Sequence, residues 1–164
     1  MGIKMGYRLI VLLASALILL GPDLASADTS APPTGALLSL EGGPFYDSSG
    51  SELVGAVGGS LGYRSSIGLE VNFSTIYVIL SGFGLRYWVP LKGKLNPYAE
   101  VAAYVDLTSE SEDDNLTYTT GIGMEYELDE FWSARLFTKL FLDNGDTDFY
   151  GGVGLTLRFG SARN

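Results

Sequence analysis

The stretch 148-DFYGGVGLTLRF-159 decides the fold, because its side chains alternate in character with a period of two. One set is apolar or glycine: Phe149, Gly151, Val153, Leu155, Leu157 and Phe159. The other set is mainly polar or glycine: Asp148, Tyr150, Gly152, Gly154, Thr156 and Arg158. Successive side chains of a β-strand point to opposite faces, so this pattern predicts one strand with an apolar face and a polar face.

The same alternation recurs upstream and predicts eight strands. The apolar sides of the other seven are Leu38–Leu40, Val57–Tyr63, Ile67–Phe73, Phe83–Val89, Ala99–Val105, Tyr118–Tyr126 and Trp132–Leu140. Turn-forming sequences separate them, at 47–50, 64–66, 90–97, 109–115, 127–130 and 143–146, with the least certain connection at 74–77. We therefore expect an all-β fold, an eight-stranded antiparallel up-and-down barrel.

The N-terminus has the features of a cleavable secretory signal peptide. Lys4 and Arg8 precede a mainly apolar run from Leu9 to Leu20, and Ala25-Ser26-Ala27 forms a cleavage site. The run is too short for a membrane-spanning helix, which needs roughly 20 residues. We expect a signal peptide at 1–27, a flexible lead-in at 28–35, the barrel at 36–159 and a short tail at 160–164.

Composition narrows the chemistry. The 164 residues include no Cys and no His, so thiolate chemistry and the commonest general base and metal ligand are absent. The net charge of −9 makes nucleic acid an unsuitable partner. A pair of Ser133 and Lys139 is conceivable, but six residues of strand separate them by about 20 Å. We therefore expect no enzymatic activity, no cofactor and no metal site.

Acidic loops leave a cation site open as an alternative. The segment Glu110-Ser-Glu112-Asp113-Asp114 has suitable carboxylates without an ordered calcium-loop pattern, and a solvated loop explains it better. The sequence Asp143-Asn-Gly-Asp146 suits a tight hairpin turn. These segments belong to connections that we assign to one end of the barrel, whereas Lys92 and Lys94 lie at the other end.

Alternation alone does not distinguish a soluble barrel from a membrane barrel, which is inverted. The polar face carries charges in mid-strand, and glycines beside them leave room for long side chains in a narrow lumen. We expect a structural network of ion pairs there, formed by Glu41, Glu70, Arg86, Glu100, Glu125, Arg135, Lys139 and Arg158. This distribution favours the inverted, lipid-facing form.

Aromatic residues near the strand ends predict two girdles at the membrane interfaces. One would hold Tyr63, Tyr87, Trp88, Tyr98, Tyr126, Trp132 and Phe159. The other would hold Tyr46, Phe73, Tyr77, Tyr104, Tyr118, Phe141 and Phe149. The alternation places Trp88, Tyr98 and Tyr104 on the inward face, so these three need not belong to a girdle.

The ending Gly154-Leu-Thr-Leu157-Arg-Phe159 resembles the Gly-x-x-apolar-x-aromatic signal by which outer-membrane barrels are recognised for assembly. Over about 36–159 the chain resembles the small OmpA/OmpX-type outer-membrane β-barrels, although five residues follow Phe159. The resemblance implies an outer-membrane protein that meets lipid, lipopolysaccharide and the barrel-assembly machinery, and we expect a monomer. Two functions remain open: a plugged structural or surface-interaction barrel, or a narrow porin-like channel for small solutes.

Overall fold

A computed structural model describes residues 34–48, 52–77, 79–89, 91, 93–108, 116–143 and 146–159. The predicted signal peptide, most of the lead-in and the C-terminal tail lie outside these residues. Within the described ranges, no helix is long and apolar enough to cross a membrane.

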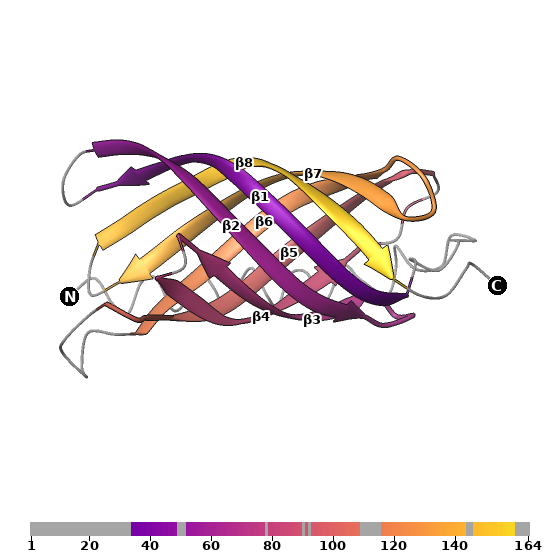
Figure 1. Ribbon diagram of the computed structural model, residues 1–164, viewed down its shortest axis with the longest axis horizontal. Helices are drawn as coiled ribbons and strands as arrows, with labels where there is room; N and C mark the ends of the chain where they lie inside the picture. Colours follow the sequence, from indigo (N-terminus) through magenta and orange to yellow (C-terminus); the bar gives the residue numbers. More distant parts are fainter. Residues whose placement is uncertain are drawn as a thin grey trace.

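The described chain forms a closed barrel in which each strand pairs with its neighbours in sequence order (Figure 1). The strands are β1 (Gly35–Asp47), β2 (Glu52–Arg64), β3 (Leu69–Ile76), β4 (Leu80–Trp88), β5 (Leu95–Asp106), β6 (Leu116–Glu127), β7 (Trp132–Asp143) and β8 (Asp146–Phe159). All pairs are antiparallel, and β8 closes the barrel against β1. The predicted eight-stranded up-and-down barrel is confirmed.

The pairing register fixes how the strands wind around the barrel. A path from partner to partner leaves β1 at Ala36, passes through all the other strands and returns to β1 at Tyr46. The ten-residue offset between these two positions is the shear of the barrel. Residues that are neighbours across the sheet therefore lie on a spiral, not on a flat ring.

The two ends of the barrel differ. The terminal end carries Gly35, Phe159 and the connections 65–68, 89–94 and 128–131. The opposite end, called the loop end below, carries the connections 48–51, 77–79, 107–115 and 144–145. Three of the four loop-end connections have four residues or fewer, so the strands themselves account for most of the described molecule.

Several predicted strand ends were wrong by one to three residues. Ile67 lies in a turn, where Gly68 has a φ of 80° that suits glycine, and β3 begins only at Leu69. Leu95 already belongs to β5, although it was assigned to the preceding connection. Arg64 and Glu127 were assigned to turns, but they are the last residues of β2 and β6. In each case, backbone pairing with the adjacent strand decides the boundary.

Candidate functional site: a closed polar lumen

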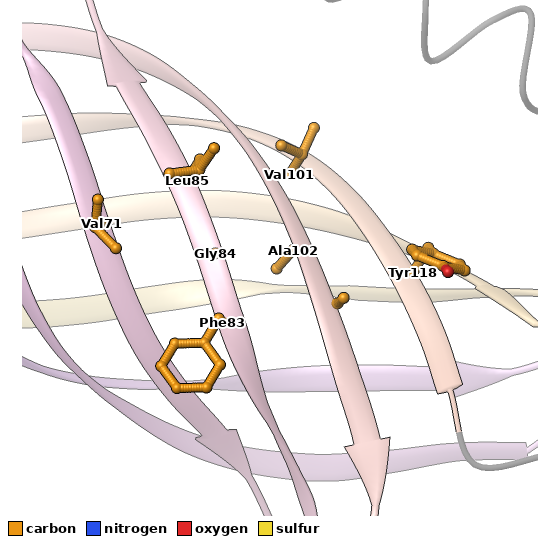
Figure 2. A pocket seen from close by; sticks show the side chains of 8 residues that line it. Val71, Phe83, Gly84, Leu85, Val101, Ala102 and Tyr118 are labelled. Atoms are coloured by element: carbon orange, nitrogen blue, oxygen red, sulfur yellow. The ribbon is translucent and has the colours of Figure 1, made fainter.

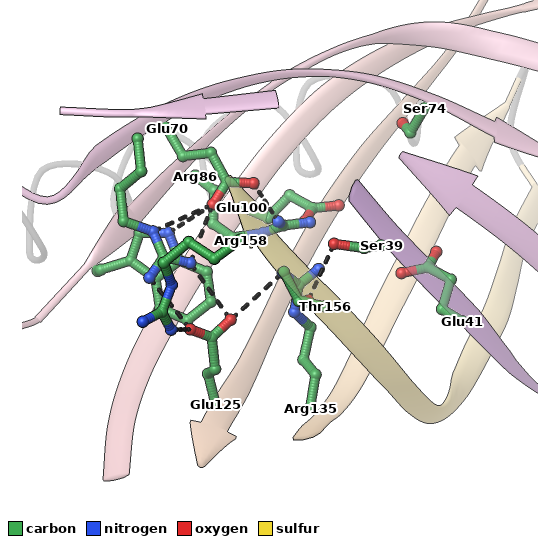
Figure 3. A network of polar contacts seen from close by, with 12 residues as sticks. Ser39, Glu41, Glu70, Ser74, Arg86, Glu100, Glu125, Arg135, Thr156 and Arg158 are labelled. Atoms are coloured by element: carbon green, nitrogen blue, oxygen red, sulfur yellow. Dashed lines mark hydrogen bonds and ion pairs between the residues drawn. The ribbon is translucent and has the colours of Figure 1, made fainter. Parts of the chain in front are cut away.

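The structure places all eight predicted network residues inside the barrel. They come from seven of the eight strands, and none is more than 7% exposed: Glu41, Glu70, Arg86, Glu100, Glu125, Arg135, Lys139 and Arg158. Figure 3 shows most of these side chains converging in the lumen. A charge at this depth is tolerated only when it is paired and hydrogen-bonded.

The register explains the first part of the network. Arg64, Glu70, Arg86 and Glu100 are successive cross-strand partners on β2, β3, β4 and β5. Arg64 lies 3.3 Å from Glu70, and Arg86 Nη1 donates to Glu70 Oε1 at 2.5 Å. Arg86 also donates to Glu100 through both Nε and Nη2. Alternating signs on adjacent strands thus give every one of these charges a neighbour of opposite sign.

A second part of the network crosses the lumen and meets at Glu125. Arg64 donates to the two oxygens of Glu125 at 3.1 and 3.2 Å. Arg135 Nη2 lies 3.4 Å and Arg158 Nη2 3.7 Å from the same carboxylate. Three guanidinium groups therefore share this one carboxylate.

Lys139 connects the network to β1. Its ammonium lies 2.6 Å from Glu41 and 3.3 Å from Glu100. Because Lys139 is occupied by these two carboxylates, its amine is not available to activate Ser133, which lies six residues away on the same strand. The described residues thus offer no Ser–Lys nucleophile.

The sequence prediction missed Arg64 as a member of the network. Arg64 is fully buried and is bonded to both Glu70 and Glu125. The alternation of Gly58, Ser60 and Gly62 already placed Arg64 on the polar face, but the residue was assigned to a turn. The signal that could have identified it was therefore its position on the polar face, which the turn assignment overrode.

Glycines make room for the long charged side chains. A Cβ at Gly121 would lie 3.1 Å from Lys139 Cγ, and one at Gly154 would lie 3.3 Å from Glu41 Cβ. The tightest contact with a side chain is at Gly123, where a Cβ would lie 2.4 Å from Tyr98 Cζ. The Tyr98 ring thus crosses β6 in a space that only glycine leaves open.

An aromatic pair lies among the guanidinium groups. The rings of Trp88 and Tyr98 have centroids 4.3 Å apart, and Arg64 Cζ lies 3.8 Å from the Trp88 centroid. Trp88 Nε1 donates to Glu70 at 2.9 Å. Cation–π contacts and this hydrogen bond tie the aromatic pair into the ionic network. Both residues are buried in the lumen and belong to no girdle, as the alternation indicated.

Towards the loop end, aromatic side chains occupy much of the lumen. Phe45, Tyr104, Phe137, Phe141 and Tyr150 are in ring contact with one another, with the Phe45–Phe141 centroids 5.5 Å apart and those of Phe137 and Tyr150 4.9 Å apart. The buried side chains of Ala56 and Ile76 belong to the same cluster. We call these seven residues the aromatic cluster. Rings packed at such distances leave no room for a wide aqueous channel.

Phe141 corrects a sequence prediction, because it was assigned to the girdle near the loop end. It is 2% exposed and packs against Phe45 and Tyr104. Phe141 points into the lumen because it lies an even number of residues from Arg135 and Lys139 and so shares their face of β7. The sequence analysis placed Trp88, Tyr98 and Tyr104 on the inward face, but it did not identify Phe45, Phe137 and Phe141 as interior residues.

The outer wall is apolar along the strands. On β2, the exposed apolar side chains run from Leu53 to Tyr63. On β8, they run from Phe149 to Phe159. Ten residues at about 3.3 Å each, on strands tilted by about 40°, give a band roughly 25 Å tall, as transmembrane barrels require.

Exposed aromatic side chains lie at both edges of this band. Tyr63, Tyr126, Trp132 and Phe159 lie towards the terminal end, and Tyr46, Tyr77, Tyr118 and Phe149 lie towards the loop end. Between them, a shallow groove crosses β3, β4 and β5 (Figure 2). Its surface is apolar, because the side chains that line it are those of Val71, Phe83, Leu85, Val101, Ala103 and Tyr118.

The described residues contain no group of three or more acidic side chains that could hold a metal ion. The loop with Glu110, Glu112, Asp113 and Asp114 lies outside the described residues. The same holds for the side chains of Asp143 and Asp146. The cation alternative therefore stays a sequence-based hypothesis.

No protein-family model matches the chain, and no curated protein matches its sequence. Solved structures do match its fold. The N-terminal β-barrel domain of Pseudomonas aeruginosa OprF aligns with a TM-score of 0.56 and 18% identity, covering 77% of this chain and 100% of the domain. Neisserial surface protein A aligns with a TM-score of 0.55 and 14% identity, covering 76% and 95% of the two chains.

A de novo designed transmembrane β-barrel aligns comparably, with a TM-score of 0.54 and 15% identity over 79% of this chain and 99% of the design. Natural and designed barrels thus share this architecture at low sequence identity. The chain has the fold of the small, eight-stranded, OmpA-like outer-membrane β-barrels.

Proposed function

We propose that this protein is an integral outer-membrane barrel whose lumen is closed, and that it acts as a structural or surface-interaction element without enzymatic activity. The observation that carries the proposal is the set of buried side chains that occupies the lumen. The ionic network lies towards the terminal end and the aromatic cluster towards the loop end, and the two meet at Lys139, whose ammonium lies 5.2 Å from the Phe137 ring centroid.

The outer wall supports the membrane location. Its exposed leucines, valines and aromatic rings have the height of a bilayer core, and no comparable apolar surface would be stable in water. The chain would be exported by its N-terminal signal and inserted with its terminal end in the periplasm. Gly154, Leu157 and Phe159 would then serve as the signal for the assembly machinery, with Phe159 exposed at the end of β8.

The short loop-end connections favour a structural role. Apart from the connection 107–115, each has at most four residues, so little of the chain can project beyond the membrane. Outer-membrane lipid and lipopolysaccharide are the proposed partners of the wall and the rim. The acidic connection 107–115 is the main surface left for other contacts.

Conductance tests the closed lumen. The purified protein is inserted into a planar bilayer, with a wide porin inserted in the same way as the positive control. We expect no steady ion current from this protein. Discrete, stable currents would support the alternative of a narrow solute channel and overturn the proposal.

Fractionation tests the location separately. In Gram-negative cells that express the full chain, we expect the protein in the outer-membrane fraction, with a gel mobility that changes on boiling. Recovery in the soluble fraction without detergent would overturn the membrane assignment.

A further inference from the structure

Arg135 has more hydrogen-bond donors than the residues around it can satisfy. Its side chain is buried, and only Nη2 has a carboxylate partner, Glu125 at 3.4 Å. Its Nε and Nη1 atoms find no hydrogen-bond acceptor among the described residues. A buried guanidinium with three unused N–H groups is costly unless water or an ion occupies the space beside it.

The carboxylate beside Arg135 cannot neutralise it fully. Arg64 already contacts both oxygens of Glu125, at 3.1 and 3.2 Å, which is closer than Arg135. Arg135 therefore shares Glu125 with a closer guanidinium and is only partly compensated by it. Positive charge is left over at Arg135, in a low-dielectric setting where it acts strongly.

A second unused donor lies next to this guanidinium. The Tyr98 hydroxyl is buried and has no hydrogen-bond partner among the described residues. The Tyr98 ring centroid lies 5.6 Å from Arg135 Cζ, and its hydroxyl reaches over Gly123 on the strand that neighbours β7. The unused N–H groups of Arg135 and the unused hydroxyl of Tyr98 can together donate hydrogen bonds to a small anion.

We propose that a single small monovalent anion, of the size of chloride, binds in the lumen between the Arg135 guanidinium and the Tyr98 hydroxyl. Both groups donate hydrogen bonds to it, and the neighbouring Trp88 ring, 5.5 Å from Arg135 Cζ, lines the site. The burial of the site selects monovalent anions over doubly charged ones, which lose more hydration energy.

Tryptophan fluorescence reports on this site directly. The chain has two tryptophans, and Trp132→Phe removes the one on the outer wall, so Trp88 alone remains as reporter. Iodide carries the same charge as chloride and quenches tryptophan fluorescence. It is titrated into a solution of the barrel in a neutral detergent, and gluconate keeps the ionic strength constant. We expect quenching that saturates with iodide and is reversed by chloride.

Three variants in the Trp132→Phe background identify the donors. Arg135→Gln removes the saturable quenching, and Tyr98→Phe weakens iodide binding at least about fivefold by removing one hydrogen bond to a charge. Lys94→Gln, which removes an exposed cation near the terminal end, leaves binding unchanged. Boiling-dependent gel mobility checks that each variant is folded, and Tyr98→Phe carries the test if Arg135→Gln does not fold.

Quenching that rises linearly without saturation would overturn the proposal, as would equal iodide affinity in the parent and in Tyr98→Phe. In either case, water alone occupies the space beside Arg135. This test is independent of the closed-lumen proposal. An anion site in a closed lumen gives no bilayer current. An open channel gives current whether or not iodide binding saturates.

Discussion

Replacing Arg86 with methionine tests whether the ionic network is dry and cooperative. Arg86 bridges Glu70 and Glu100, and all three residues are at most 3% exposed. Methionine keeps much of the side-chain volume, so the change removes the charge and leaves little cavity. Two buried carboxylates then lose their shared cation.

The expected loss in the free energy of unfolding depends on which partners these two carboxylates retain. Breaking a fully buried ion pair costs about 3–5 kcal/mol. Glu70 retains Arg64 at 3.3 Å and the Trp88 indole at 2.9 Å, and Glu100 retains Lys139 at 3.3 Å. Since each carboxylate keeps a second partner, we expect the lower end, about 3 kcal/mol.

The assay is equilibrium urea unfolding in lipid vesicles, with the folded fraction read from gel mobility without boiling. This readout avoids Trp88 fluorescence, which the substitution itself would change. Lys94→Met, in an exposed connection, is the matched control and should cost less than about 0.5 kcal/mol. A loss below about 1 kcal/mol for Arg86→Met would refute the reasoning, since it would mean that water screens the network.

Three further predictions concern other parts of the barrel. Gly123→Ala should cost about 1–3 kcal/mol in the same unfolding assay, because the new methyl group would collide with the Tyr98 ring; a neutral result would mean that the ring moves freely. Leu85→Arg on the outer wall should cost about 2–4 kcal/mol in vesicles, and no change would contradict the assignment of that wall to lipid. In the turn 128–131, backbone N–H groups at 2.7 and 2.8 Å hold the pKa of Asp129 below its usual 3.8. The stabilisation from Asp129 is therefore present above the unfolded pKa of about 3.9 and is lost as pH falls through the lower folded value; an NMR titration of the carboxyl carbon that gives a pKa at or above 3.8 would contradict this.

The architecture could be predicted because alternation is a local property. A strand such as β8 shows its two faces within twelve residues, and the same period in the other strands identifies their inward side chains without knowledge of their partners. The inward position of Glu125 or Lys139 therefore follows from the sequence alone.

The pairing inside the lumen could not be predicted in the same way. The contact between Arg64 and Glu125 joins β2 to β6 across the interior, and it depends on the shear and radius of the closed barrel. The pairs on adjacent strands do follow from hairpin geometry once the register is known: Arg64–Glu70, Glu70–Arg86, Arg86–Glu100 and Glu125–Arg135.

The phenylalanines of the aromatic cluster were missed for a chemical reason. Aromatic side chains suit a lipid-facing wall, an interfacial girdle and a packed interior equally well, so the residue type alone does not place them. The position of Phe141 in the alternation of β7 shows that its side chain points inward. This inference is reliable only when β7 is known to continue unbroken to Asp143.

Accessibility along β2 tests the inverted barrel most directly. The chain has no cysteine, so single cysteines at positions 57 to 63 can carry spin labels without background. In vesicles, we predict that collisions with dissolved oxygen, which concentrates in lipid, are frequent at Val57, Leu61 and Tyr63 and rare at Ser60 and Gly62. Frequent oxygen collisions at Ser60 and Gly62, with Val57 and Leu61 protected, would contradict the account.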